Sequence, residues 1–267
     1  MPDRLSAEQS ERYQAHLALA RIGVAGQARL LRARVLLLGV GGLGCPAALY
    51  LTAAGVGSLG LLDDDIIDRT NLQRQILFGP ADLGARKAEV AAERLASLNP
   101  DVELRPIIER LTAGNAASLV AGWDVVIDGS DNFATRYIVN DACVLAGIPL
   151  VSGSIYQFEG QVTVIRTPAG PCYRCLFPSP PPEQAACRDA GVLAPLPGMV
   201  GSIQAAETIK LVVGEEASLI GRLLLVDALA SSFRSVNVRR NPGCPLCGES
   251  PTIRRPTAVA VCRGPVD

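Results

Sequence analysis

The stretch from Val35 to Leu62 contains no charged residue, and it constrains the fold more than any other part of the chain. It is long enough to cross a bilayer as a helix. However, its glycines gather at 39–44 and 55–60, with Pro46 between them, and such residues interrupt a helix of that length. We therefore interpret this stretch as strand, tight turn, helix, turn and strand, all buried within a sheet.

Beyond this stretch, short apolar runs alternate with amphipathic segments. The expected strands are Val35–Leu38, Ser58–Leu62, Val102–Ile108, Val125–Ile127 and Pro149–Gly153. The expected helices are Pro46–Ala54, Lys87–Leu98, Ala113–Ala121 and one that ends at Ala146. This alternation is typical of a doubly wound, mostly parallel sheet, so we predict a Rossmann-like α/β fold.

The two ends of the chain depart from this alternation. Near the N-terminus, Ser6 and Gln9 have the spacing of a capping box, and we expect a helix to about Leu19, a break at Gly23–Gly26 and a short helix, Gln27–Arg32. Towards the C-terminus we expect antiparallel strands at Gly160–Arg166, Leu223–Asp227 and Phe233–Val238, a proline-rich loop over Pro178–Pro197, and a helix, Gly198–Val213, that ends at Gly214. We predict three parts: an N-terminal helical segment (1–33), one α/β domain (34–249) and a flexible tail (250–267).

A glycine-rich turn, Gly39-Val-Gly-Gly-Leu-Gly44, joins the first strand of the expected sheet to its helix. Such a turn lets backbone N–H groups approach a phosphate, and a helix N-terminus favours its negative charge. Asp63 ends the next strand, where an acidic residue bonds a ribose hydroxyl. These features predict a nucleotide site, but they fit NAD as well as ATP.

Two basic residues favour ATP over NAD. Arg74 ends the segment Thr70-Asn-Leu-Gln-Arg74, and Lys87 begins the next expected helix. Cations beside a phosphate-binding turn stabilise the charge that develops on a triphosphate. The alternative for each residue is an exposed surface charge.

A second acidic motif, Asp128-Gly-Ser-Asp131-Asn132, follows a buried strand at the sheet edge where open α/β folds bind ligands. A carboxylate there suits Mg²⁺, which takes one or two carboxylates together with phosphate oxygens. Asp131 also fits the N-cap of a helix that begins near Phe133. We interpret Asp128 as structural.

Two cysteine pairs, Cys172-Tyr-Arg-Cys175 and Cys244-Pro-Leu-Cys247, have the spacing of a four-cysteine zinc site. They lie too far apart in the sequence for a local zinc ribbon, which closes within about 15–20 residues. We therefore predict a zinc ion that joins two distant stretches of one fold. Two disulfides, or four unligated thiols, are the alternatives.

The overall composition excludes several classes of protein. The formal net charge is −1, so nothing indicates a basic surface for DNA or a polybasic membrane contact. Residues 1–4 begin no apolar signal sequence, and eight cysteines without a signal peptide indicate a reducing, cytoplasmic environment. His16 is the only histidine, which leaves no Ser–His pair and no histidine-rich metal centre.

Several sequence blocks together resemble the MoeB/ThiF/HesA family of ubiquitin-activating-type adenylyltransferases. They are GVGGLG (39–44), AAGVG (53–57), NLQRQILF (71–78), NP (99–100), DGSDN (128–132), CYRCL (172–176), CRDAGVLAP (187–195) and NPGCPLCG (241–248). The likeness extends from about Arg12 to Gly248. It implies ATP-dependent adenylation of the C-terminal Gly-Gly carboxylate of a small ubiquitin-like sulfur-carrier protein, which precedes thiocarboxylate formation.

The resemblance also implies the ligands and the residues that bind them. It assigns ATP contacts to Gly42, Asp63, Thr70, Asn71, Leu72, Gln73, Arg74, Lys87, Asp131 and Asn132, and zinc to the four cysteines. Asp131 matches the acid that holds Mg²⁺, while we expect Arg74 and Lys87 to stabilise phosphate charge. A homodimer is implied as well. Because no rhodanese-like segment follows residue 248, we expect a separate sulfur donor.

Two positions leave the catalytic details open. In some members of the family, a cysteine at the position of Cys187 forms a carrier–enzyme thioester or a mixed disulfide, and Arg188 beside it favours a thiolate. An unreactive loop thiol is the alternative. The family usually reads RYxRQ near residue 12, and its second arginine enters the partner subunit's ATP site. Here Ala15 occupies that position, so either Arg12, Arg21 or a protonated His16 substitutes for it, or turnover is slower.

Three other functions compete with carrier adenylation. An NAD-dependent oxidoreductase uses the same glycine turn but does not explain Arg74, Lys87, Asp131 or the cysteine pairs. A non-catalytic carrier-binding scaffold fits the change at Ala15. Adenylation of another carboxylate, such as a peptide C-terminus or a tRNA-attached threonylcarbamoyl group, keeps the chemistry and changes the partner. The sequence names neither the carrier nor its pathway.

Overall fold

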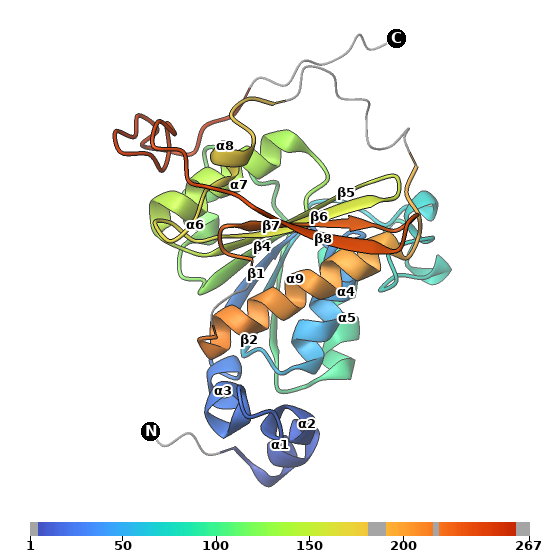
Figure 1. Cartoon of the computed structure of the whole chain (residues 1–267). Coiled ribbons are helices and arrows are strands. Elements are labelled where there is room, and N and C mark those ends of the chain that lie inside the picture. Colours follow the sequence, from blue (N-terminus) through green and yellow to red (C-terminus); the bar gives the residue numbers. More distant parts are fainter. Residues whose placement is uncertain (1–4, 181–190, 216–218, 260–267) are drawn as a thin grey trace.

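One eight-stranded sheet forms the centre of the computed structural model, which describes residues 5–180, 191–215 and 219–259 (Figure 1). Its strands are β1 (Arg34–Leu38), β2 (Ser58–Leu62), β3 (Glu103–Ile107), β4 (Val125–Asp128), β5 (Leu150–Tyr156), β6 (Glu159–Ile165), β7 (Arg222–Asp227) and β8 (Ser232–Asn237). They lie in the order β3-β2-β1-β4-β5-β6-β7-β8. The first five are parallel and the last three join antiparallel, which confirms the predicted doubly wound sheet with an antiparallel extension.

The apolar strands of the expected sheet are buried on both faces. In β1, Val35 and Leu37 belong to one apolar cluster, whereas Leu36 and Leu38 belong to the cluster on the opposite face. Successive side chains of a strand point to opposite faces, so a continuous apolar run suits a strand with helices on both sides. The uncharged stretch therefore forms two buried strands of the sheet, β1 and β2, with the glycine turn and a helix between them. The expectation that all of it is buried is wrong for this helix, where Tyr50 is 58% exposed.

Helices cover both faces of this sheet (Figure 1). One face carries α4 (Gly44–Ala53), α5 (Lys87–Leu98) and α9 (Leu196–Val213), whose apolar residues join the β1 cluster of Val35 and Leu37. The other face carries α6 (Ala116–Val120) and α7 (Phe133–Ala146), with the short α8 (Tyr173–Leu176) beside α7. Helix α8 was not predicted, nor were the 3₁₀ turns η1 (Arg69–Asn71) and η2 (Pro80–Asp82).

The N-terminal segment forms α1 (Ala7–Arg12), α2 (Gln14–Leu17) and α3 (Gly23–Leu30). The predicted capping box of Ser6 and Gln9 is confirmed, because both reciprocal hydrogen bonds are present. The predicted break at Gly23–Gly26 is wrong, since these residues form the first turn of α3. Gly26 is buried where α3 packs on α9, and a Cβ there would lie 3.1 Å from Ile22 at the start of the same helix. Tertiary packing thus overrides a low helix propensity.

After β8, the described chain to Val259 contains no helix or strand but contacts the α/β body. Ile253 and Val259 pack against the apolar cluster around α7, and the Thr257 backbone N–H donates to Asp141 Oδ2 at 3.1 Å. The predicted domain limits and the flexibility of the tail stay predictions. Among the described residues, no helix is both long and apolar enough to cross a membrane.

Candidate active site and metal centre

A cavity of about 330 Å³ opens at the carboxyl ends of β1, β2 and β4. The strand order reverses at β1: β2 and β3 lie on one side of β1, and β4 and β5 lie on the other. Open α/β folds bind their ligands at such a reversal of strand order, because the loops that follow neighbouring strands diverge there. The topology therefore puts the loops after three strands around one space.

The glycine turn forms one wall of this cavity, and two of its residues have no room for a side chain. Gly39 has a φ of +84°, and a Cβ there would lie 3.0 Å from the Gly129 carbonyl oxygen. A Cβ at Gly44 would lie only 2.0 Å from the Gly39 carbonyl oxygen. The tight turn between β1 and α4 depends on both glycines, and it brings the N-terminus of α4 to the cavity, where unpaired N–H groups suit an anion.

Gly42 lies in the middle of this turn and lines the cavity. A Cβ at Gly42 would lie 3.2 Å from the Pro197 Cβ, in the first turn of α9. The helix that crosses the sheet late in the chain therefore begins directly beside the glycine turn. Sequence reasoning placed Gly42 at the nucleotide site but gave no indication of this neighbour.

Asp63 lines the cavity at the end of β2 and holds two backbone segments in place. Its Oδ2 accepts a hydrogen bond from the Val40 N–H at 2.7 Å, and its Oδ1 accepts one from the Asp65 N–H at 2.9 Å. Burial raises the pKa of this carboxyl above its ordinary value, although the Lys87 ammonium and the two backbone donors oppose the shift. Asp63 thus links the glycine turn to the loop after β2.

The two predicted cations line the same cavity from separate segments. Arg74 is half-buried, and its guanidinium donates to the Thr70 carbonyl at 3.0 Å. Lys87 is the first residue of α5, its side chain is only 7% exposed, and its Nζ lies 2.8 Å from Asp65 Oδ2. Thr70, Asn71, Leu72 and Gln73 form the turn behind Arg74 and are not among the residues that line the cavity, so their predicted ATP contacts stay a prediction.

Asp131 and Asn132 line the cavity from the loop between β4 and α7. The N-cap of α7 is Asn132, whose Oδ1 accepts from the Thr135 N–H at 2.9 Å, so the expectation that Asp131 caps this helix is wrong. The Asp131 carboxylate is exposed and accepts only a long contact, 3.4 Å, from Asn132 Nδ2. It therefore presents oxygen ligands of the kind that Mg²⁺ prefers.

Asp128 is fully buried beneath this loop. Its Oδ1 accepts a hydrogen bond from the Ser130 N–H at 2.9 Å. Burial raises the pKa of the Asp128 carboxyl, and the charge of Arg136 opposes that shift. The position of Asp128 agrees with its interpretation as a structural residue, because it shapes the loop that carries Asp131.

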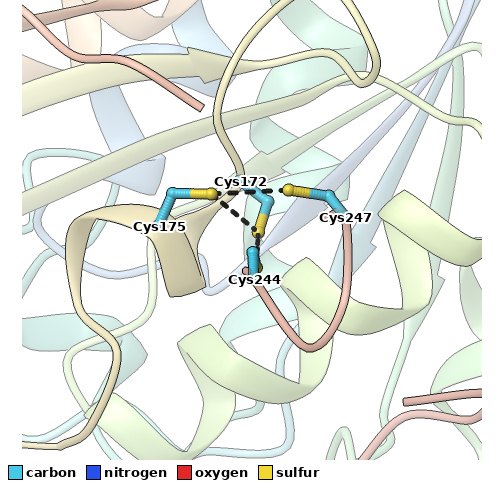
Figure 2. A group of neighbouring side chains, drawn as sticks. All are labelled: Cys172, Cys175, Cys244 and Cys247. Carbon is cyan, nitrogen blue, oxygen red and sulfur yellow. Dashed lines mark hydrogen bonds between the residues drawn. The ribbon is translucent and has the colours of Figure 1, made fainter. Parts of the chain in front are cut away.

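The four predicted metal ligands converge on one point, with their sulfur atoms directed toward one another (Figure 2). The Sγ–Sγ distances are 3.9 Å for Cys172–Cys175, 3.6 Å for Cys172–Cys244 and 3.4 Å for Cys175–Cys247. These distances contradict the disulfide alternative, since a disulfide bond is about 2.05 Å long. Four sulfurs bound about 2.3 Å from a tetrahedral zinc ion lie about 3.8 Å apart, so the donor set fits zinc.

Helix α7 supports this cysteine cluster through a buried polar network that the sequence did not predict. Asn140 Oδ1 accepts from the Tyr173 N–H at 2.8 Å. The Arg174 guanidinium binds both carboxylate oxygens of Asp141 at 2.7 and 2.8 Å, and their side chains are 7% and 0% exposed. A signal was available, because Asn140 and Asp141 are polar residues in an otherwise apolar helical segment.

Comparison with protein families decides which family this fold and site represent. The model of the ThiF family matches residues 13–246. The chain belongs to the ThiF family. It is 50% identical over 258 residues to the "Sulfur carrier protein adenylyltransferase" of Thermus thermophilus, covering 94% of this chain and 95% of that protein. It is 51% identical over 247 residues to the "SAMP-activating enzyme E1" of Haloferax volcanii, covering 92% and 91% of the two chains.

Other relatives of this ThiF family protein are longer or more distant. The chain is 51% identical to the "Adenylyltransferase and sulfurtransferase MOCS3" of Bos taurus, but it spans only 55% of that protein. Among solved structures, Escherichia coli MccB with ATP superposes with a TM-score of 0.76 at 25% identity, covering 84% of this chain and 69% of that one. These matches agree with the mixed sheet described above.

The cavity of this ThiF family protein also contains residues that sequence reasoning missed. They include Asp65, Gln75, Glu109, Arg110, Ser130, Arg136, Tyr156 and Val192. Gln75 follows the predicted motif directly and Arg136 lies one helical turn beyond Asn132, so extending both motifs would have found them. Tyr156 is the last residue of β5 and Val192 lies in the segment before α9, and no local pattern links them to the site. Cys187 lies outside the described residues.

Proposed function

We propose that this protein uses ATP to adenylate the C-terminal Gly-Gly carboxylate of a small ubiquitin-like sulfur-carrier protein. One observation carries the proposal: a single cavity gathers the glycine turn, Arg74, Lys87 and Asp131 from four separate segments. The names of two relatives at about half identity, a sulfur carrier protein adenylyltransferase and a SAMP-activating enzyme, support it. So does the solved structure of MccB with ATP.

In the proposed reaction, a carboxylate oxygen of the carrier attacks the α-phosphorus of ATP. The bond from that phosphorus to the oxygen bridging to the β-phosphate breaks, and pyrophosphate leaves with the electron pair. The chain's own residues orient the two reactants and neutralise charge. The glycine turn holds the phosphates with backbone N–H groups, Asp63 accepts from the ribose hydroxyls, and Arg74 and Lys87 stabilise the charge that develops on the phosphates.

This reaction needs no acid–base side chain, because a carboxylate is already ionised at neutral pH. His16 agrees with that requirement. Its Nδ1 lies 2.9 Å from Gln27 Oε1 in the N-terminal segment, and it does not line the cavity. The chemistry is therefore positioning and electrostatic stabilisation.

Two metal ions complete the proposal. Asp131 would hold Mg²⁺, which neutralises phosphate charge when bound. The four cysteines would hold a structural Zn²⁺, because all four positions of a tetrahedral site are filled by protein ligands and none is open for catalysis. Zinc therefore joins α8 to the segment after β8, and it takes no part in the reaction.

The N-terminal arginines support a homodimer in which one subunit completes the site of the other. The Arg12 guanidinium donates to the Leu98 carbonyl, at the end of α5 remote from Lys87. Arg21 pairs with Glu215 at 2.8 Å, just beyond the end of α9 remote from Pro197. Neither arginine reaches the cavity of its own chain, so the substitute for the family arginine would come from a partner. Sedimentation as a monomer at micromolar concentration would contradict this arrangement.

Two further parts of the proposal concern the cell: the protein acts in the cytoplasm, and it receives sulfur from a separate donor protein.

The last part of the proposal concerns Cys187, which forms a covalent adduct with the carrier. A Cys187→Ser variant tests this part, since adducts with the carrier under non-reducing conditions should disappear.

The decisive test is carrier-dependent exchange of labelled pyrophosphate into ATP. We expect exchange with a small protein that ends in Gly-Gly and copurifies with this chain, and none when that terminus is removed. Asp131→Ala should lower exchange by at least about 100-fold, as removal of one electrostatic contact in an active site does. Its circular dichroism should stay unchanged, because the Asp131 side chain supports no other element. Exchange retained in this variant would refute the role of Asp131.

The same assay separates the competing functions. A rise in thermal stability with NAD but not with ATP and Mg²⁺ would indicate an oxidoreductase. Carrier binding without exchange would indicate a scaffold. Exchange stimulated by a short peptide and not by a folded carrier would indicate adenylation of a different carboxylate.

A further inference from the structure

Lys87 occupies an unfavourable position for a cation. It is the first residue of α5, where the helix dipole is positive, and its side chain is almost fully buried. Desolvation favours the neutral form of a buried amine. An ammonium that is to bind phosphate at this place therefore needs a nearby negative charge.

Asp65 supplies that charge through two contacts. Its Oδ2 lies 2.8 Å from Lys87 Nζ, and its backbone carbonyl accepts from the Lys87 backbone N–H at 3.1 Å. The loop is also paired to the start of α5, because Ile66 forms an antiparallel bridge with Arg86, and the Arg86 guanidinium donates to the Asp64 carbonyl at 2.6 Å. The position of the carboxylate relative to the helix start is thus determined by main-chain contacts.

Among the described residues, the ion pair of Lys87 is with Asp65. Asp63 lies close enough for its charge to interact with that of Lys87, but it forms no ion pair with Lys87, and its oxygens accept the Val40 and Asp65 backbone N–H groups. On α4, burial raises the pKa of the Cys45 thiol to about 12, so it carries no charge at neutral pH. The other charged residues that line the cavity form no ion pair with Lys87 in the part of the chain that the structure describes; they are Asp64, Arg74, Glu109, Arg110, Asp131 and Arg136.

We propose that Asp65 is a positioning residue, which holds the buried Lys87 side chain in place and directs it at the phosphates of the nucleotide. This inference rests on the proposed function, since it assumes that the cavity binds ATP. Asp65 does not contact the nucleotide in this role. It acts through Lys87, and its own carboxylate is 63% exposed, at the cavity rim.

Asp64 provides a matched control. It precedes Asp65 directly and also lines the cavity, but its carboxylate makes no hydrogen bond or ion pair within the described residues. Asp64→Asn and Asp65→Asn therefore remove the same charge from the same loop. Only the second substitution removes the partner of Lys87.

The test is the affinity for ATP and Mg²⁺, measured by calorimetry at neutral pH. We expect Asp65→Asn to weaken binding by roughly tenfold or more, because Lys87 loses the partner that orients it. Asp64→Asn should stay within about twofold of the unsubstituted protein. Asp65→Glu, which keeps the charge, should recover most of the lost affinity and serves if Asp65→Asn folds poorly.

A second variant tests whether Asp65 acts through Lys87. In a Lys87→Gln background, Asp65→Asn should change the affinity by no more than about twofold, because the effects of two residues that act together are not additive. Asp65→Asn indistinguishable from Asp64→Asn, or an equal loss with and without Lys87, would overturn the inference while leaving the proposed function intact. Absence of ATP binding by the unsubstituted protein would overturn both.

Discussion

The roles of the carboxylates at the cavity depend on burial as much as on neighbouring charges. Asp63 and Asp131 end neighbouring segments of the same site, yet one is held by backbone donors and the other is exposed. Asp128, only three positions before Asp131, is fully buried and its pKa is raised. Three carboxylates in one region thus have three different tasks: holding a turn, offering ligand oxygens and shaping a loop.

Because the pKa of Asp128 is raised in the folded protein, we expect the stability of the protein to depend on pH. Its folded pKa lies above the unfolded one, so the folded state holds the proton more strongly, and stability falls as pH rises from the unfolded pKa through the folded one. Asp128→Asn keeps an oxygen for the Ser130 N–H and does not titrate. We expect the melting temperature of the variant, relative to that of the unsubstituted protein, to rise as the pH is raised from about 4. A constant difference between about pH 4 and 8 would contradict the assignment.

At the scale of elements, α7 connects the nucleotide cavity to the cysteine cluster. Its N-cap, Asn132, lines the cavity. About two turns further along α7, Asn140 accepts the Tyr173 backbone N–H and Asp141 binds the Arg174 side chain, both within the Cys172–Cys175 segment. A helix is stiff over such a length. The cysteine cluster therefore helps to set where α7 begins, although it lies outside the cavity.

Breaking this connection should be costly. Asp141→Ala leaves the Arg174 guanidinium buried without its carboxylate, and we expect a loss of about 3–5 kcal/mol in the free energy of unfolding. Glu103→Ala is the matched control: it breaks the Arg105–Glu103 pair, whose side chains are 50% and 58% exposed, and should change the stability far less, because solvent screens an exposed pair. Urea unfolding of both variants measures the difference. Equal losses would show that the Asp141 pair is not a structural link.

At the scale of the whole molecule, the cysteine cluster brings together two segments that lie far apart in the sequence. Cys175 and Cys247 are 72 positions apart, and α9, β7 and β8 lie between them. The antiparallel extension of the sheet ends in the exposed strand β8, which has one neighbour only. The cross-link therefore holds the outer end of the sheet to the α7 face.

Removing the metal should loosen this outer part of the sheet first. Chelation, or Cys244→Ser, should lower stability by about 2–5 kcal/mol, comparable with the loss of a native cross-link, or roughly 4–20 °C in melting temperature. Hydrogen exchange should quicken in β7 and β8 more than in β1 and β2, which lie in the middle of the apolar clusters. Elemental analysis checks for bound zinc, and uniform loss of protection across the sheet would contradict the proposed role.

Local patterns predicted the parts of this protein that depend on neighbours in sequence. The limits of α5 and β2 agree with those expected, because a 3.6-residue period with a following Asn-Pro, and an apolar run between glycines, need no distant partner. Short motifs likewise indicated the glycine turn and Asp131, which follow strand ends, and Arg74 and Lys87, which lie in the turn and at the helix start that come after β2.

Only the tertiary structure decided which residues meet across the sheet. Gly26 joins a helix because Val213 packs against it, and Pro197 lies beside Gly42 because α9 crosses β5 and β6. Asp65 pairs with Lys87, and Asp141 with Arg174, over 22 and 33 positions of intervening chain. Such contacts arise from strand order and helix packing, which bring remote segments together. Local sequence patterns carry no information about which remote segments meet, so only the tertiary structure decides these contacts.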